Sequence, residues 1–164
     1  MIKIESSEIS IRPYSSNDKI AVLQLLNLNT PKYFHKSERK DFEKYLEEEI
    51  EDYFVVENNV EIIGAGGINY MAQDKTARIS WDMIKPNLQG QGIGKYLMTH
   101  RLKYLSTQSE IEIIDVRTTQ LSFQFYEKMN FKLFKIEKDF WAEGFDLFQM
   151  QQENKSTAVG SHYI

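Results

Sequence analysis

The sequence predicts a mixed α/β fold (α+β in some schemes) built on one central sheet. Strand-like apolar segments alternate with helical stripes, and a glycine-rich turn at 89–94 joins a strand to an amphipathic helix. A nearly all-apolar segment, 111–116, follows that helix and suits a strand covered on both faces. The expected order is β-α-α-β-β-β-α-β-α-β-β, with one β-α-β unit at its centre.

The first half of the chain predicts one strand, two helices and a hairpin. Apolar side chains at helical spacing, Ile20, Leu23 and Leu26, place the first helix. Asn58 and Asn59 place the hairpin turn, because asparagine tolerates a positive φ. The expected bounds are a strand at 9–12, helices at about 20–26 and 42–51, and strands at 53–56 and 60–70.

The second half predicts the rest of the sheet and two more helices. Pro86 ends the fourth strand, and the helix after the glycines carries an apolar stripe that includes Leu97 and Leu105. Asn130 is expected to end the last helix in a left-handed conformation. The expected bounds are strands at 77–85, 111–116, 131–140 and 145–150, and helices at about 93–105 and 121–129.

The composition indicates a globular protein with one core. The chain has 164 residues, 41% of them hydrophobic, and no apolar run of the roughly 20 residues that span a bilayer. It lacks a signal-peptide pattern, and without cysteine it has no disulfide, thiolate metal site or cysteine nucleophile. We therefore expect a cytoplasmic protein with one domain at 1–151 and a polar tail at 152–164.

The charge pattern narrows the class of partner. The net charge is −4 and no long basic run is present, which argues against a nucleic-acid surface. An acidic balance leans towards a cationic small substrate. The three histidines show no metal-ligand spacing, so no metal is expected.

The glycine turn, Gln89-Gly90-Gln91-Gly92-Ile93-Gly94, predicts an anion-binding site. The start of a helix carries backbone N–H groups without partners and about half a positive charge. Glycine lets that backbone approach an anion with no Cβ in the way. A phosphate group is therefore expected on the amides from about Gln91 to Lys95.

Two other phosphate motifs do not fit this turn. A Walker A loop needs serine or threonine after Gly-Lys, and here Tyr96 follows Gly94-Lys95. A Rossmann fingerprint needs Gly-x-Gly-x-x-Gly on the first strand–helix turn, whereas this turn is Gly-x-Gly-x-Gly and lies in mid-chain. A merely flexible turn is the structural alternative, and three alternate glycines disfavour it.

The glycine turn and the residues that follow it resemble the signatures of the GCN5-related N-acetyltransferases. The family's Gln/Arg-x-x-Gly-x-Gly/Ala signature is matched by Gln89, Gly92 and Gly94. Its second signature, Asn-x-x-Ala-x-x-Phe-Tyr-x-x-x-Gly-Phe, reads here Thr119, Ser122, Phe125-Tyr126 and Asn130-Phe131. The resemblance is tight from Trp81 to Phe131 and looser from Ile9 to Met150. It implies a GNAT fold with about seven strands and four helices, splayed between the fourth and fifth strands.

The resemblance also implies acetyl-CoA as co-substrate and assigns roles by position. Tyr126 would act as general acid near the thioester sulfur. Met83 and Ile84 would pair with the pantetheine arm as if it were an added strand, and Phe125 and Thr119 belong to the cofactor side. Thr119 replaces the family's usual asparagine, which alters that contact. The pyrophosphate would be held, mainly through backbone amides, by Gln89, Gly90, Gln91, Gly92, Ile93, Gly94 and Lys95.

The general base is the least defined position. Asp82 lies on the predicted fourth strand and could accept a proton through a water. Its alternative roles are binding a cationic substrate or pairing with Arg78, which occupies the position where the family most often has an acidic residue. Asp115 is the second candidate, with an ion pair to Arg117 as its alternative role.

The predicted function is direct transfer of an acetyl group from acetyl-CoA to a primary amine, without a covalent enzyme intermediate. Two alternatives stay open: a non-catalytic acyl-CoA-binding regulatory module on the same fold, and an enzyme that uses the glycine turn for ATP or NAD. The expected acceptor is a small-molecule amine, with a protein amine as the second option. No nucleic-acid or membrane partner is expected, and the resemblance is compatible with a homodimer.

Overall fold

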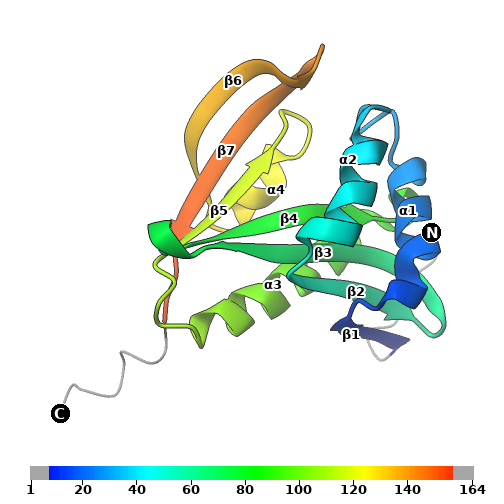
Figure 1. Cartoon of the computed structure of the whole chain (residues 1–164), viewed down its shortest axis with the longest axis horizontal. Coiled ribbons are helices and arrows are strands. Elements are labelled where there is room, and N and C mark those ends of the chain that lie inside the picture. The colour runs from blue at the N-terminus through cyan, green and yellow to red at the C-terminus, as the bar shows by residue number, and fades with distance from the viewer. Residues whose placement is uncertain (1–7, 157–164) are drawn as a thin grey trace. The chain divides into compact units, whose positions relative to one another are not determined.

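The computed structural model describes residues 8–156, and the part of the expected tail at 157–164 lies outside them. Seven strands form one sheet in the order β1-β2-β3-β4-β5-β7-β6, which confirms the predicted fold (Figure 1). The strands are β1 (Ile9–Pro13), β2 (Asp52–Asn58), β3 (Glu61–Met71), β4 (Thr76–Ile84), β5 (Ile113–Thr118), β6 (Lys132–Ala142) and β7 (Phe145–Glu153). The α-helices are α1 (Lys19–Leu28), α2 (Glu38–Lys44), α3 (Ile93–Ser106) and α4 (Phe123–Lys128).

The described chain divides into two compact units. The first comprises the chain up to Gly67 together with Trp81–Met98. The second comprises Ile68–Ser80 and the chain from Thr99 onward. Strands β3 and β4 and helix α3 contribute residues to both units.

A cluster of buried apolar side chains forms the core of the first unit. Burying a large apolar side chain contributes roughly 1.5–3 kcal/mol, so this cluster is a main source of the unit's stability. It draws on α1, α2 and the strands that these helices cover. Its members include Val22, Leu25, Leu26, Phe42, Tyr45, Leu46, Tyr53, Val55, Ala65 and Met83.

Helix α1 faces the core with most of the predicted stripe. Leu26 is buried and Leu23 packs against the core cluster, whereas Ile20 is 82% exposed. Val22 and Leu25 are buried as well. The helical period was therefore predicted correctly, and the expectation was wrong at Ile20 alone.

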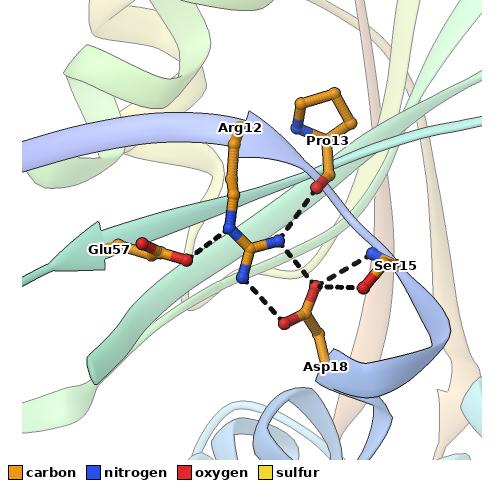
Figure 2. A network of polar contacts seen from close by, with 5 residues as sticks. All are labelled: Arg12, Pro13, Ser15, Asp18 and Glu57. Atoms are coloured by element: carbon orange, nitrogen blue, oxygen red, sulfur yellow. Dashed lines mark hydrogen bonds and ion pairs between the residues drawn. The ribbon is translucent and has the colours of Figure 1, made fainter. Parts of the chain in front are cut away.

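An ionic network joins β1, β2 and the turn before α1 (Figure 2). Arg12 donates to both carboxylate oxygens of Asp18 at 2.8 Å and also contacts the carboxylate of Glu57. The amide of Ser15 donates to the same Asp18 carboxylate at 2.9 Å. The hydrogen bonds from Arg12 are the main reason that the pKa of Asp18 lies below its ordinary value.

The second predicted helix ends in a π-helical turn at Tyr45–Glu49. Phe42 and Leu46 are buried, but Ile50 has an extended backbone and lies outside the helix. A π turn holds more residues than an α turn, so a strict spacing of four does not continue through it. The helical segment therefore ends at Glu49 rather than near Glu51.

Close backbone packing explains one of the glycines in β3. A Cβ at Gly67 would lie 2.5 Å from Cδ2 of Tyr53 and 2.6 Å from the carbonyl oxygen of Asp52. The backbone of β3 at Gly67 therefore packs too closely against β2 to admit a side chain. The predicted hairpin turn is also present, with Asn59 at φ 56°.

The second unit contains the parallel and antiparallel pairs at the other end of the sheet. Strand β4 pairs in parallel with β5, from Thr76 opposite Ile113 to Ile79 opposite Val116. The last residues of both strands lie beyond this register, so the sheet is open here, as the resemblance implied. Strand β7 pairs antiparallel with both β5 and β6, and β6–β7 is a long ribbon (Figure 1).

The last described residues are tied to the second unit. Strand β7 continues to Glu153, two residues past the expected domain end at 151. The side-chain amide of Asn154 then donates to the carbonyl oxygens of Leu105 and Ile111, each at 2.9 Å. Asn130 has φ 71°, as predicted for the residue that ends α4. No helix within residues 8–156 combines the length and apolar character needed to cross a bilayer.

Candidate functional site

The glycine turn in the first unit connects β4 to α3. A 3-10 turn at Pro86–Leu88 follows β4, and α3 begins at Ile93. Gly90 has φ 79° and Gly92 has φ 87°, a region that side-chain-bearing residues rarely adopt. A Cβ at either position would meet no atom within 4 Å, so backbone conformation rather than crowding is the reason for glycine there.

The amides of this turn are not used by the helix. The hydrogen bond from Tyr96 N to Gly92 O, at 3.0 Å, is the first of the helical ladder. Within the described residues, the amides from Gln91 to Lys95 donate to no backbone carbonyl. Unpartnered donors at a helix start, with the helix dipole behind them, suit an anion.

The side chain of Gln89 connects this turn to the segment after α1. Its Oε1 accepts a hydrogen bond from the hydroxyl of Tyr33 at 2.9 Å, and its Nε2 lies 3.4 Å from Oδ1 of Asn29. Asn29 is buried and also donates to the carbonyl of Leu25 at 2.8 Å. Sequence reasoning missed Asn29 and Tyr33, because they lie about 60 residues before Gln89 and belong to no motif.

At the end of β4, the neighbouring residues Met83 and Ile84 have different surroundings. The Met83 side chain is buried in the core, so only its backbone can pair with a ligand strand. The carbonyl of Ile84 already accepts a hydrogen bond from Nδ2 of Asn29 at 3.2 Å. Asn29 therefore contacts both the strand end and the glutamine that opens the turn.

Asp82 follows a break in the regular alternation of β4. Trp81 has φ 50°, and its carbonyl accepts a hydrogen bond from the hydroxyl of Tyr53 at 3.0 Å. The Trp81 ring lies 4.8 Å from that of Phe42 and stacks on Phe34 at 6.0 Å. The irregular backbone and these aromatic contacts fix the segment that carries Asp82, which is partly buried.

The second unit holds the motif residues after β5. Tyr126 on α4 is buried, and its ring makes edge-to-face contacts with Phe125 at 5.1 Å and Phe131 at 5.8 Å. The hydroxyl of Thr119 accepts a hydrogen bond from the amide of Leu121 at 3.2 Å. In this chain Thr119 therefore shapes the turn before α4.

A family model described as an acetyltransferase (GNAT) domain matches residues 13–154. The chain belongs to the GNAT acetyltransferase family. The match spans both the glycine turn and Phe125-Tyr126, the two motifs on which the resemblance rested. A comparison with curated proteins gives no match for this GNAT chain.

Solved structures with a similar fold are themselves N-acetyltransferases. The ribosomal-protein-S18-alanine N-acetyltransferase of Escherichia coli has 16% identity and a TM-score of 0.75, over 95% of this chain and 99% of that chain. An N-acetyltransferase of Staphylococcus aureus has 19% identity and a TM-score of 0.71, over 90% and 99%. The spermidine N-acetyltransferase of Vibrio cholerae has 19% identity and a TM-score of 0.66, over 92% and 98%. At these identities the likeness shows the GNAT fold.

Two ion pairs considered from sequence have other partners in this GNAT domain. Nε of Arg78 pairs with Oδ2 of the buried Asp115 at 2.7 Å, rather than with Asp82. Oδ1 of Asp115 accepts hydrogen bonds from Gln149 at 2.8 Å and Gln151 at 2.9 Å, so an Asp115–Arg117 pair was the wrong expectation. Strand register decides this, because Arg78 lies directly opposite Asp115.

A titratable group that sequence reasoning missed lies at the start of α2. Glu38 accepts a hydrogen bond from the amide of His35 at 2.8 Å. The pKa of Glu38 is raised to about 7, mainly by burial and also by the charge of Asp41, against the hydrogen bond from His35. The stacking of Phe34 on Trp81 holds the preceding loop against β4.

In residues 8–156, no group of three or more histidine or acidic side chains is arranged for a metal ion.

Proposed function

We propose that this protein is an enzyme that transfers an acetyl group from acetyl-CoA directly to a primary amine. The glycine turn carries the proposal. Its two left-handed glycines present unpartnered amides, from Gln91 to Lys95, at the start of α3. Such a turn suits a pyrophosphate, because backbone N–H groups and the helix dipole at a helix start favour an anion.

The residues present fit a CoA pyrophosphate. The space that a Cβ would occupy at Gly90 and Gly92 is open, so a phosphate can approach the backbone. Among the structures with this fold, the Vibrio cholerae spermidine N-acetyltransferase and an aminoglycoside 6'-N-acetyltransferase are described in complex with CoA. These observations support the assignment of Gln89, Gly90, Gln91, Gly92, Ile93, Gly94 and Lys95 to the cofactor.

The rest of the proposed cofactor site follows the chain on either side of the turn. The backbone of Met83 and Ile84 would pair with the pantetheine arm. Because Ile84 O already accepts from Asn29, that carbonyl is held in place before the cofactor arrives. Thr119 and Phe125 are assigned to the cofactor side on their motif positions.

The proposed proton transfers use groups of this chain. When bound, acetyl-CoA supplies the acetyl group as a thioester. Tyr126, as general acid, would donate its hydroxyl proton at the sulfur of the leaving thiol. Asp82, as general base, would accept the proton that the attacking amine must lose, directly or through a water. Positioned acid and base groups of this kind typically contribute on the order of 10² to 10⁴ in rate.

Glu38 is a second candidate for the base. Its pKa of about 7 suits a group that must both accept and release a proton near neutral pH. The motif position favours Asp82, whereas the shifted pKa favours Glu38. Replacing each with its amide distinguishes them, because only loss of the true base removes the acid-side fall in the kcat/KM profile.

The proposed acceptor is a small-molecule amine, with a protein amine as the alternative. The net charge of −4 favours a substrate that arrives as an ammonium ion. The structural neighbours include both types: one acts on spermidine and one on the alanine of a ribosomal protein. A panel of small amines and peptides, assayed by CoA release, tests this assignment.

The decisive variant is Tyr126→Phe. An enzyme should lose about 10²-fold or more in kcat while its Kd for acetyl-CoA stays unchanged. A non-catalytic CoA-binding protein would release no CoA with any amine in either form. Stabilisation of the protein by ATP or NAD, and not by acetyl-CoA, in a thermal-shift screen would overturn the proposal.

A further inference from the structure

We propose that Arg117 binds a carboxylate of the acceptor, so that the substrate is a small molecule with both an amine and a carboxylate. The inference rests on the proposed function and deepens it. It concerns a face of the second unit formed by Arg117 and its neighbours on β4, β5, β6 and β7.

No acidic side chain within residues 8–156 forms a direct ion pair with Arg117, although the charge of Asp115 acts on it from a greater distance. Its guanidinium lies over two rings, 5.6 Å from the centroid of Trp141 and 5.8 Å from that of Phe140. Within residues 8–156 it makes these contacts and no hydrogen bond or ion pair. Five N–H donors are therefore available to a ligand.

The carboxylate two residues earlier on β5 is already engaged. Asp115 takes one hydrogen bond from Arg78 on one oxygen and two, from Gln149 and Gln151, on the other. Asp115 is thus the carboxylate nearest to two guanidinium groups, and it is Arg78 that contacts it directly. Burial lowers the pKa of Arg117 and the charge of Arg78 lowers it further, while the charge of Asp115 opposes both effects.

The carboxylates of Asp139 and Asp146 in the β6–β7 ribbon contact backbone amides rather than Arg117. Oδ1 of Asp139 accepts a hydrogen bond from the amide of Gly144 at 2.8 Å. Oδ1 of Asp146 accepts one from the amide of Asp139 at 2.9 Å. Both carboxylates are thus bound by backbone amides inside the turn.

The aromatic platform under Arg117 is fixed by hydrogen bonds. Nε1 of Trp141 donates to the carbonyl of Thr118 at 3.1 Å. Gln120 bridges the same segments, donating to Gly144 O at 2.6 Å and accepting from Asp146 N at 2.9 Å. A stacked guanidinium held in this way keeps its edge donors free for a planar, bidentate partner, which a carboxylate is.

The position of Arg117 also suits a ligand site. It lies at the carboxyl end of β5, one residue beyond the parallel register with β4, which ends at Val116. In open α/β sheets, ligands bind at the carboxyl ends of parallel strands where the sheet opens. An amine without a carboxylate would meet an unmatched positive charge at this point, which disfavours it.

The test compares matched amines that differ in one charge. CoA release is measured for the wild type, Arg117→Gln and Arg117→Lys. Each protein is assayed with three pairs of amines, in which a carboxylate is compared with its amide: β-alanine and β-alaninamide, γ-aminobutyrate and its amide, and lysine and lysinamide. Lys138→Gln is the control, because it removes an exposed cation from the same ribbon. We expect the wild type and the control to prefer the carboxylate form by about tenfold or more in kcat/KM, and Arg117→Gln to reduce that ratio to near one.

Other outcomes separate this inference from the proposed function. Equal kcat/KM of the wild type for the carboxylate and the amide of each pair would overturn the inference. A loss of CoA affinity in Arg117→Gln would also overturn it, because the anion bound by Arg117 would then belong to CoA. If no amine is acetylated, the proposed function fails. The carboxylate site is then tested by calorimetry, which compares the Kd of N-acetyl-β-alanine with the Kd of its amide. A lower Kd for the carboxylate form, lost in Arg117→Gln, would still support the site, and equal Kd values would overturn it.

Discussion

Tyr33 donates a hydrogen bond from its hydroxyl to Oε1 of Gln89, at 2.9 Å, and so connects the segment after α1 to the first residue of the glycine turn. Asn29 contacts the same glutamine and the carbonyl of Ile84. The loop after α1 thereby holds both the turn proposed for the pyrophosphate and the strand end proposed for the pantetheine arm.

Tyr33→Phe is expected to weaken acetyl-CoA binding without unfolding the protein. One neutral hydrogen bond is worth about 0.5–1.5 kcal/mol, which corresponds to a roughly 2- to 10-fold rise in Kd. Titration calorimetry measures the change. Tyr104→Phe on the exposed side of α3 is the control and should leave Kd unchanged. A Tyr33→Phe protein with unaltered affinity would show that the Gln89 contact is only structural.

Gly92→Ala is expected to reduce both stability and CoA affinity. No atom obstructs a Cβ at Gly92, but φ 87° is strained for alanine by roughly 1–2 kcal/mol. Gly144→Ala provides a matched control, since Gly144 has φ 83° and equally open space in the β6–β7 turn. Chemical denaturation should show similar losses for both variants, whereas calorimetry should show weaker acetyl-CoA binding for Gly92→Ala alone.

Glu38→Gln is expected to stabilise the protein at alkaline pH. The folded-state pKa of about 7 lies above the ordinary value of 4.5, so the unfolded chain loses this proton first. Stability contributed by Glu38 is therefore lost as the pH rises from about 4.5 through 7. The Tm of Glu38→Gln should exceed that of the wild type at pH 8 and match it near pH 4. The exposed Glu48→Gln should show no such dependence, and an equal response in both variants would contradict the assignment.

Asp115→Ala is expected to destabilise the second unit strongly. Asp115 is 1% exposed and accepts hydrogen bonds from Arg78, Gln149 and Gln151, which would all lose their acceptor. Breaking a buried pair of this kind costs about 3–5 kcal/mol. Urea denaturation measures the loss, and Lys135→Ala at the exposed pair with Glu137 should cost less than about 1 kcal/mol. Similar losses in the two variants would argue against a structural role for Asp115.

The sequence by itself determined the order of the elements, the family and the position of the glycine turn. These depend on local signals: apolar periodicity, turn residues, and glycines where φ is positive. The predictions for Asn59 and Asn130 succeeded for the same reason. Each is a backbone requirement that a residue type expresses on its own.

Only the tertiary structure decided which side chains meet. It turned α1 so that Ile20 faces solvent, joined Arg78 to Asp115 across two strands, and brought Asn29 and Tyr33 to Gln89. It also raised the pKa of Glu38 by burial and set Arg117 on two aromatic rings. Contacts of this kind depend on strand register and on packing between segments distant in sequence, and no residue pattern within one segment encodes them.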